Sequence, residues 1–347
     1  AWLKPWLRAA VLEFLQQRGL IGIQAEELGV TQYTTGFSNL TYLLQAGDQE
    51  FVLRRPPAGA VKRGHDMSRE FKVLTALNQG FSQAPIAYAY TDDLSITGSS
   101  FYVMEKVEGI ILTYREAVKR NISPLEFMAI SEQWLSTFVA LHQLDYRALG
   151  LGELGRPEGY VERQVHNWGK QYLKAKTEEI PAAEQVMAWL EENQPTSYNH
   201  ALIHNDYKYD NVVFADDTWQ ELRAVLDWEM CTLGDPLMDL GTSLAYWSVA
   251  DDGEAVTKGW PSPTILLGNP SRDELVESYA KLSGRDVGNF VFYYAYGLFK
   301  IAVIVQQIYY RYQKGLTSDE RFANLNQATR LFSSLAWRAI QRKKIVG

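Results

Sequence analysis

The stretch His204-Asn205-Asp206-Tyr207-Lys208-Tyr209-Asp210-Asn211, together with the later Asp227-Trp228-Glu229, decides how this chain is interpreted. The apolar run 201–203 precedes the first stretch, and residues 211–226 contain two apolar runs separated by a polar turn. This pattern predicts a strand, a loop and then a pair of strands that ends at Asp227. We therefore expect Asp227 to lie close to Asn211.

These residue types suit phosphoryl transfer, in which the protein mainly positions the acceptor hydroxyl and neutralises phosphate charge. Asp206 can accept the proton of the attacking hydroxyl, and Lys208 can reach the phosphoryl group. Asn211 and Asp227 offer the hard oxygen ligands that Mg²⁺ prefers. Asp is also common in turns, so ordinary loop carboxylates are the alternative interpretation. Several independent spacings would have to coincide by chance, which favours a site.

The motif H-x-D-x-K-x-x-N at 204–211, followed by an Asp after a strand, resembles the catalytic and metal motifs of protein kinases. Residues 226–240, which contain Gly234-Asp235-Pro236 and Asp239-Leu240, are instead similar to the aminoglycoside phosphotransferase and choline kinase-like superfamily. Within it, the chain most resembles kinase-like domains that occur alone in bacteria or fused to acyl-CoA dehydrogenases. The resemblance covers nearly the whole chain.

The resemblance implies an α+β, protein-kinase-like two-lobed fold, with ATP and Mg²⁺ as cofactors. A small, β-rich, nucleotide-binding N-lobe is expected over residues 1–104, followed by a hinge at 105–109. A large, mainly helical C-lobe over 110–347 is expected to hold the catalytic loop, the metal site and the acceptor site. The length of 347 residues suits one two-lobed unit better than two independent domains.

The chain departs from the related sequences in three places. Asn205 stands where the superfamily usually has Gly, and Arg54 stands where it usually has Lys. Trp228-Glu229 replaces the Phe-Gly of protein kinases, so Glu229 either helps to hold a second metal ion or has a purely structural role. A long activation loop does not fit before Gly234, so regulation by loop phosphorylation is not expected.

The N-lobe is expected to begin with a helix over 3–18 and to continue with strands and turns over 34–54. Ser38 and Asn39 lie at the tip of one turn, where they can present polar groups to phosphate oxygens. An ordinary hairpin turn is the alternative for this stretch taken alone.

Val52 and Arg54 are expected to share one face of their strand, because side chains alternate along a strand. Val52 would then cover the adenine, and Arg54 would reach the phosphates. Residues 68–77 predict an amphipathic helix on which Glu70 is the expected ion-pair partner of Arg54. A solvated Glu on the helix surface is the alternative.

Residues 101–109 form a β-rich run that resembles the hinge between the lobes. By this resemblance, Glu105 and Val107 contact adenine through their backbone groups, and Met104 borders the adenine pocket. The sequence of the run alone would also fit any edge strand.

The C-lobe is expected to contain a buried helix over 124–141, whose apolar positions include Leu125 and Met128. His142 follows this helix and is expected to be a structural, hydrogen-bonding residue. The apolar stretch 290–310 is long enough to span a bilayer but contains Lys300, so a buried helix is expected there.

The acceptor site is expected on helical segments of the C-lobe, where the candidates are Arg163, Trp168, Tyr172 and Arg311. Core positions are the alternative for the two aromatic residues. Residues 289–318 contain no Asp or Glu, whereas polycationic aminoglycosides require carboxylates around them. We therefore expect an anionic or partly apolar small-molecule acceptor, and the resemblance implies a hydroxy acid or a hydroxyacyl-CoA.

The composition is that of an ordinary globular protein, with 46% hydrophobic and 22% charged residues. A formal charge of −7, from 34 basic and 41 acidic residues, argues against nucleic acid as a partner. The one cysteine, Cys231, is expected to be a small buried residue. The first residues lack a signal-peptide pattern, so a cytoplasmic location without a membrane partner is expected. The oligomeric state stays open.

Two other functions compete with a kinase for a hydroxylated acid. The first is an aminoglycoside- or choline-type kinase, which would phosphorylate a cationic alcohol or amino sugar. The second is a nucleotide-binding pseudokinase that serves as an interaction module. Arg54 favours the second, because pseudokinases often lack the usual strand lysine.

Overall fold

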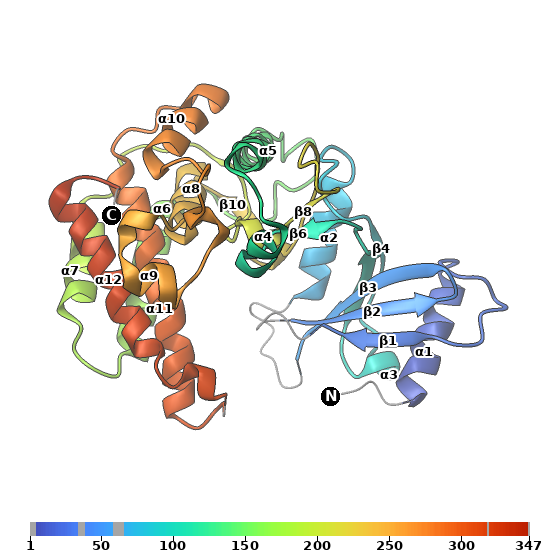
Figure 1. Ribbon diagram of the computed structural model, residues 1–347. Coiled ribbons are helices and arrows are strands. Elements are labelled where there is room, and N and C mark those ends of the chain that lie inside the picture. Colours follow the sequence, from blue (N-terminus) through green and yellow to red (C-terminus); the bar gives the residue numbers. More distant parts are fainter. Residues whose placement is uncertain (1–4, 34–38, 58–65, 318, 346–347) are drawn as a thin grey trace. The chain divides into compact units, whose positions relative to one another are not determined.

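The computed structural model describes residues 5–33, 39–57, 66–317 and 319–345 (Figure 1). The chain divides into two compact units. The first comprises Ala1–Gly109, Arg147–Leu151 and Arg223–Cys231, and the second comprises Ile110–Tyr146, Gly152–Leu222 and Thr232–Gly347. The main division follows Gly109, the last residue of the expected hinge, but the first unit also includes two short segments from later in the chain.

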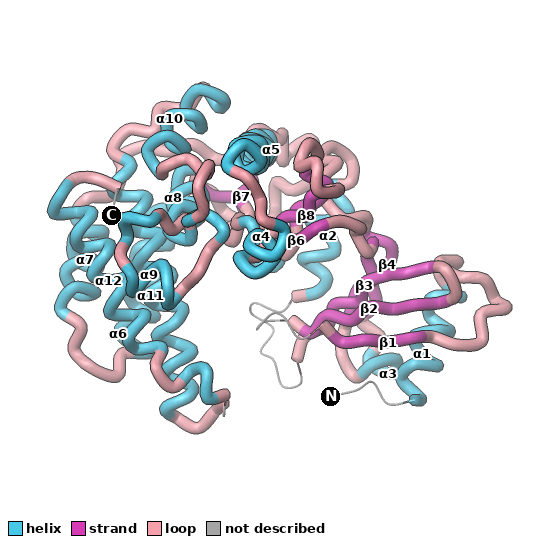
Figure 2. Tube along the Cα trace, viewed as in Figure 1, coloured by secondary structure: helices cyan, strands magenta, loops and turns pink. Residues whose placement is uncertain are grey.

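The first unit is built on a five-stranded antiparallel sheet with strand order β1-β2-β3-β5-β4 (Figure 2). Its strands are β1 (Gly29–Gln32), β2 (Leu40–Ala46), β3 (Gln49–Arg55), β4 (Ala87–Thr91) and β5 (Phe101–Glu105). Its helices are α1 (Pro5–Gln17), α2 (Met67–Leu77), α3 (Leu94–Thr97) and the short 3-10 helix η2 (Trp228–Met230). β5 pairs with both β3 and β4, so the alternative of an edge strand for this run was wrong.

The two faces of β3 have different roles. Phe51 and Leu53 are buried in a core with Phe14 and other residues of α1. Because side chains alternate along a strand, Val52 and Arg54 lie on the opposite face. Both are also buried, with 7% of each residue exposed. The face that sequence periodicity assigned to the nucleotide is therefore separate from the face that holds the hydrophobic core.

The second unit is mainly helical. Its helices are α4 (Tyr114–Arg120), α5 (Pro124–His142), α6 (Tyr160–Ala175), α7 (Pro181–Glu192), α8 (Pro236–Tyr246), α9 (Glu254–Gly259), α10 (Arg272–Ser283), α11 (Phe290–Gln313) and α12 (Leu325–Arg342). Two short antiparallel pairs join β6 (Ile110–Ile111) to β8 (Val212–Phe214) and β7 (Ala201–Ile203) to β10 (Thr232–Gly234). Short 3-10 helices are η1 (Tyr209–Asn211), η3 (Ala250–Asp252), η4 (Pro263–Ile265) and η5 (Glu320–Phe322). β9 (Leu222–Val225) crosses the division between the units.

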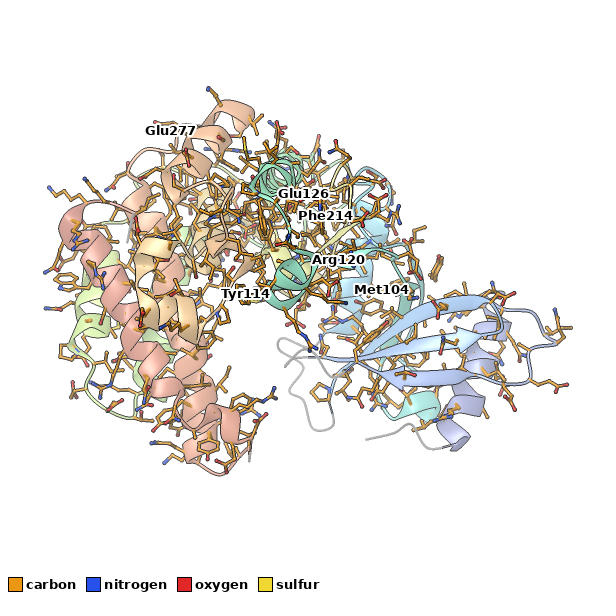
Figure 3. All side chains as sticks on the ribbon, viewed as in Figure 1. Met104, Tyr114, Arg120, Glu126, Phe214 and Glu277 are labelled. Carbon is orange, nitrogen blue, oxygen red and sulfur yellow. The ribbon has the colours of Figure 1, made fainter. Side chains whose placement is uncertain are left out.

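The helix α5 confirms the helix expected over 124–141, and it begins with a capping box between Ser123 and Glu126. Figure 3 labels Glu126 beside α5. The expected burial of Leu125 and Met128 was wrong, since these residues are 77% and 58% exposed. Helical periodicity places both on the same side as Glu132, which is also exposed. Their hydrophobicity alone therefore misassigned them to the core.

The helix α11 passes through the interior of the second unit beside α12 (Figure 1). Among the described residues it is a helix long and apolar enough to cross a membrane, but 83% of its most apolar 18-residue window is buried inside the protein. The expectation of a buried helix in this region is confirmed.

The helices α8 and α11 approach each other through Gly241 and Gly297. A Cβ atom on Gly241 would lie 2.2 Å from the carbonyl oxygen of Tyr293, and one on Gly297 would lie 2.3 Å from the carbonyl oxygen of Gly241. Both distances are far below van der Waals contact with rigid backbone atoms. This crossing therefore requires glycine on both helices.

Replacement of Gly297 by Ala is predicted to destabilise the protein by at least ~1–3 kcal/mol, the usual range for overpacking a core. The helices would have to separate to admit the methyl group. Gly259→Ala is the matched control, because a Cβ there meets nothing within 4 Å. Urea denaturation should show a lower midpoint for Gly297→Ala alone. Equal midpoints for the two variants would contradict the close helix crossing.

Candidate active site

The loop after β7 is fixed by a buried carboxylate. Asp239 on α8 is completely buried and accepts hydrogen bonds from the backbone N–H groups of His204, at 2.6 Å, and Asn205, at 2.7 Å. Its Oδ2 also lies 3.1 Å from Nε2 of His142, whose Nδ1 lies 2.8 Å from the hydroxyl of Tyr279. Asp239 therefore satisfies two backbone donors at the point where the loop leaves the strand.

The ionisation of this pair follows from burial and hydrogen bonding. Burial alone would raise the pKa of the Asp239 carboxyl, but its interactions with His142 and His204 hold that pKa below the ordinary value. Burial lowers the pKa of His142 despite the neighbouring carboxylate. His142 is therefore a buried hydrogen-bonding residue, as the sequence predicted.

Asn205 has a left-handed backbone conformation, with φ of 70°. Residues with a Cβ rarely adopt this conformation, and Asn is among the few that tolerate it. The conformation gives a physical reason for the Gly that the superfamily usually has here. It also turns the chain immediately before Asp206.

The carboxylate of Asp206 is held by two later residues of the same loop. Nζ of Lys208 lies 3.1 Å from each carboxylate oxygen. Nδ2 of Asn211 donates to Oδ2 and to the backbone carbonyl oxygen of Asp206, both at 2.8 Å. The side chain of Asp206 is 17% exposed, so it is oriented from within the protein and still accessible to a small molecule.

Lys208 keeps its positive charge. Burial would lower the pKa of its amine, but the carboxylate of Asp206 raises that pKa above the ordinary value. The amine also lies 4.8 Å from the ring centroid of Tyr246, at the end of α8. Lys208 can therefore neutralise Asp206 in the free protein and attract a phosphate when one is bound.

In the first unit, Arg54 is surrounded by three carboxylates. Its Nη1 lies 2.5 Å from Oε1 of Glu70, which confirms the expected ion pair. Its Nη2 lies 3.0 Å from Oδ1 of Asp227 and 3.4 Å from Oε2 of Glu229. Nδ2 of Asn39 donates to that Glu229 oxygen at 2.8 Å. The strand position that usually holds Lys therefore binds the carboxylates that were expected to hold metal.

The structure offers Mg²⁺ an amide oxygen in the second unit and a carboxylate in the first. Among the described residues, no three His, Cys, Asp or Glu side chains form a metal-binding group. Asn211 uses its amide N–H groups on Asp206, which leaves its Oδ1 as a potential ligand. Asp227 has a left-handed backbone conformation at φ of 67°, and its side chain is 34% exposed. The joint role of Asn211 and Asp227 stays a prediction.

The expected adenine contacts all belong to the first unit. Val52 and Met104 are partners in the register of β3 and β5, and Figure 3 shows Met104 on β5. The backbone N–H of Glu105 donates to the carbonyl of Ile86 at 2.8 Å, so the sheet already uses this donor. Glu105 could therefore contact adenine through its backbone carbonyl but not through its backbone N–H. Val107 follows the end of β5, and Ser38 lies outside the described residues.

The expected acceptor residues have different environments in the second unit. Arg163 donates to the backbone carbonyls of Arg156 and Glu158, so its guanidinium holds the loop before α6. Tyr172 is 1% exposed and belongs to the core, whereas Trp168 is partly exposed. Arg311 is exposed in the last turn of α11, as expected for a cation at a helix C-terminus.

The sequence did not predict a role in the site for three residues near Asp206. Tyr246 contacts Lys208, Asp239 holds the backbone before Asp206, and Lys300 on α11 contacts Asn205. Asp239 was visible in the motif that carries the resemblance, although its partner was not. Lys300 was visible as a lone lysine in an apolar helix, which is a signal because lysine is almost never fully buried.

The pair of Arg54 and Glu70 should be strongly coupled in stability. Arg54→Met and Glu70→Met should each cost about 3–5 kcal/mol, because each leaves a buried charge without its main partner. The double variant should lose less than the sum of the two, since both charges are then absent. Urea denaturation of the four proteins measures this coupling, with Arg55→Met on the other face of β3 as control. If the stability losses of the two single variants simply added in the double variant, Arg54 and Glu70 would not be energetically coupled.

Comparison with known proteins places this geometry in a family. The model of the phosphotransferase enzyme family matches residues 29–260. Acyl-CoA dehydrogenase family member 11 of Rattus norvegicus is 39% identical in an alignment of 308 residues that covers 84% of this chain and 38% of the rat protein. The chain thus spans about two fifths of the length of the curated relatives that it matches.

Solved structures show the same fold. A Ralstonia eutropha JMP134 protein, provisionally named an aminoglycoside phosphotransferase, has a TM-score of 0.81 and 32% identity, over 96% of this chain and 98% of that one. Choline kinase from Cryptosporidium parvum has a TM-score of 0.62 at 11% identity, over 96% of each chain. A spectinomycin phosphotransferase, solved with ADP and spectinomycin, has a TM-score of 0.60 at 12% identity, over 99% of this chain and 100% of that one.

These matches confirm the α+β, protein-kinase-like fold and the resemblance that the motifs carried. The family model covers more than half of the chain, including Arg54, Asp206, Asn211 and Asp227. This chain belongs to the phosphotransferase enzyme family.

Proposed function

We propose that this chain is an ATP- and Mg²⁺-dependent phosphotransferase that transfers the γ-phosphate to a hydroxyl of a small molecule. The carboxylate of Asp206, held by Lys208 and Asn211 at hydrogen-bond distance, is the observation that carries the proposal. A carboxylate that is oriented from two sides and remains accessible can accept a proton from an alcohol. Membership of the family supports this chemistry.

Each residue near Asp206 has a defined part in this proposal. Bound MgATP would supply the phosphoryl group and the charge-neutralising cation. Asp206 orients the acceptor hydroxyl and takes its proton. Lys208 stabilises negative charge on the phosphoryl oxygens, because its amine remains cationic. Asn211 and Asp227, with help from Glu229, would hold the cation through side-chain oxygens.

The first unit would bind the nucleotide. Val52 and Met104 would border the adenine, and the carbonyl of Glu105 and the backbone of Val107 would bind its polar edge. Arg54 would contact phosphate oxygens while Glu70 keeps the guanidinium in place. For this, Arg54 must exchange its contact with Asp227 for one with phosphate when the nucleotide and metal bind.

The acceptor is proposed to be anionic or partly apolar, such as a hydroxy acid or a hydroxyacyl-CoA. Two observations support this. Residues 289–318, which include all of α11, contain no carboxylate that could bind a polycation. The curated relatives carry the name acyl-CoA dehydrogenase, which supports a function close to acyl-CoA chemistry. An aminoglycoside- or choline-type acceptor is the alternative within the same reaction.

A pseudokinase is the second candidate function, and a specific observation favours it. Arg54 binds the carboxylates of Asp227 and Glu229 in the free protein. A guanidinium that kept these contacts would compete with Mg²⁺ for the same oxygens. Binding of ATP without metal, and without turnover on any acceptor, would support this function.

Asp206→Asn should retain the fold and nucleotide binding but reduce turnover by roughly 10² to 10⁴, the usual contribution of a general base. Asp210→Asn is the matched control, because Asp210 is an exposed carboxylate in the same loop. Transfer of labelled phosphate from MgATP into a metabolite extract, followed by mass spectrometry, measures turnover. Equal loss in both variants, or in neither, would remove Asp206 from this role.

The acceptor class should be visible in a direct competition. Hydroxy acids or hydroxyacyl-CoA thioesters should be phosphorylated faster than aminoglycosides, since charge-assisted hydrogen bonds to an anion contribute roughly 1.5–3 kcal/mol each. Arg311→Ala should raise the KM for the acceptor more than the KM for ATP, with the nearby Lys314→Ala as control. Efficient phosphorylation of an aminoglycoside, without activity on any hydroxy acid, would reject this acceptor class and leave the kinase assignment intact.

A further inference from the structure

Lys300 is a buried cation in the middle of α11. Only 2% of the residue is exposed. Its Nζ donates to the backbone carbonyl of Asn205 at 3.0 Å and to the side-chain Oδ1 of Asn205 at 3.2 Å. Both oxygens belong to amides, whereas a buried lysine is usually paired with a carboxylate. The direct hydrogen bonds of this cation are therefore spent on holding Asn205.

The residue that Lys300 holds is the one before the catalytic carboxylate. The backbone N–H of Asn205 donates to Asp239 at 2.7 Å, and its carbonyl accepts from Lys300. The hydroxyl of Tyr160 lies 3.4 Å from Nδ2 of Asn205, which adds a third element to the contact. Asn205 is thus anchored from α8, α11 and α6 at once.

This anchoring maintains an unfavourable backbone conformation. Asn205 has a φ of 70°, and its carbonyl belongs to the peptide bond that continues into Asp206. A strained conformation persists only where the surroundings determine it more strongly than local preference does. If the carbonyl of Asn205 rotates, the direction of the Asp206 side chain changes with it. The orientation of the catalytic carboxylate therefore depends on a lysine 95 positions later in the chain.

We propose that Lys300 is a positioning residue that holds Asn205, and through it Asp206, in the orientation that phosphoryl transfer requires. The proposal rests on the proposed function for its effect on turnover, but the anchoring itself does not depend on it. Lys300 does not touch the reacting groups in this arrangement. Its loss should lower kcat and leave nucleotide binding almost unchanged.

The charge of Lys300 makes the arrangement sensitive to pH. Burial lowers the pKa of its amine to about 8, against the opposing attraction of Asp239 and Asp206. Lys208 in the loop adds repulsion, and Tyr160 faces the same amide from α6. Because this pKa is lowered, Lys300 is protonated below pH 8 and loses its proton as the pH rises through that value. A neutral amine is a weaker donor to the carbonyl of Asn205.

The first measurement is independent of turnover. Amide hydrogen exchange of the peptide that covers residues 204–211 should become at least several-fold faster in Lys300→Met, which removes the donors and keeps a long side chain. Lys281→Met, an exposed lysine on α10, is the matched control and should leave this peptide unchanged. Unchanged exchange in Lys300→Met would overturn the anchoring, whether or not an acceptor for the enzyme is found.

The second measurement is the division between kcat and KM for an acceptor that the wild type phosphorylates. Lys300→Met should lower kcat by at least 10-fold and change the KM for ATP by less than about three-fold. Lys300→Gln, which keeps an uncharged donor, should recover part of the loss, and it replaces the Met variant if that variant does not fold. Full kcat in both variants would reject the proposal, whereas an inactive wild type would reject only the proposed function.

The pH profile separates positioning from a merely structural role. The kcat of the wild type should decline as the pH rises through about 8, the pKa of Lys300. This decline, the alkaline limb of the pH profile, should be absent from Lys300→Gln, whose side chain does not titrate. A variant that was only less stable would keep the limb, because its remaining folded molecules would titrate as the wild type does. Persistence of the limb in Lys300→Gln would therefore overturn the proposed role.

Discussion

The arrangement around Asp206 depends on one buried carboxylate, that of Asp239. A loop that leaves a short buried strand exposes backbone N–H groups that no neighbouring strand accepts, and leaving such groups buried costs about 1–3 kcal/mol each. Asp239 accepts two of them, from His204 and Asn205. Burying a charged carboxylate is itself unfavourable, and the bonds to these donors and to His142 offset that cost. The geometry of the loop over residues 204–211 is therefore set by the need to satisfy a charge inside the protein.

Arg54 has a comparable constraint in the first unit, but with a different outcome. A lysine at this position would present one compact charge, whereas the planar guanidinium offers donors in several directions. Arg54 uses them to contact Glu70, Asp227 and Glu229 together. Only Glu70 is fully withdrawn from solvent, so the contact with Glu70 is the permanent one. The contacts with the more exposed carboxylates are weaker because water screens them, as the proposed exchange for phosphate and metal requires.

The sequence predicted those parts of the site whose partners are close along the chain or fixed by periodicity. The spacing of Asp206, Lys208 and Asn211 specified one loop, and period-two alternation placed Arg54 opposite the core. The resemblance then supplied Glu70. Lys300 could not be predicted in its role, because its partner is a backbone carbonyl, and the sequence does not reveal which carbonyl a distant helix will meet. Leu125 and Met128 were misassigned because composition does not distinguish the two sides of a half-buried helix.

Asn205 connects these observations, because glycine would adopt its backbone conformation at lower cost. Glycine would also leave the peptide before Asp206 freer to rotate, since it has the greatest conformational freedom of any residue. Asn adds a side-chain oxygen that Lys300 binds together with the backbone carbonyl. The cost of the left-handed conformation is therefore offset by a second hydrogen bond from Lys300, to the side-chain oxygen of Asn205. Asn205 can in this way limit the orientations of the neighbouring Asp206 carboxylate. Lys300 takes part in this limit because its buried amine holds both oxygens of Asn205.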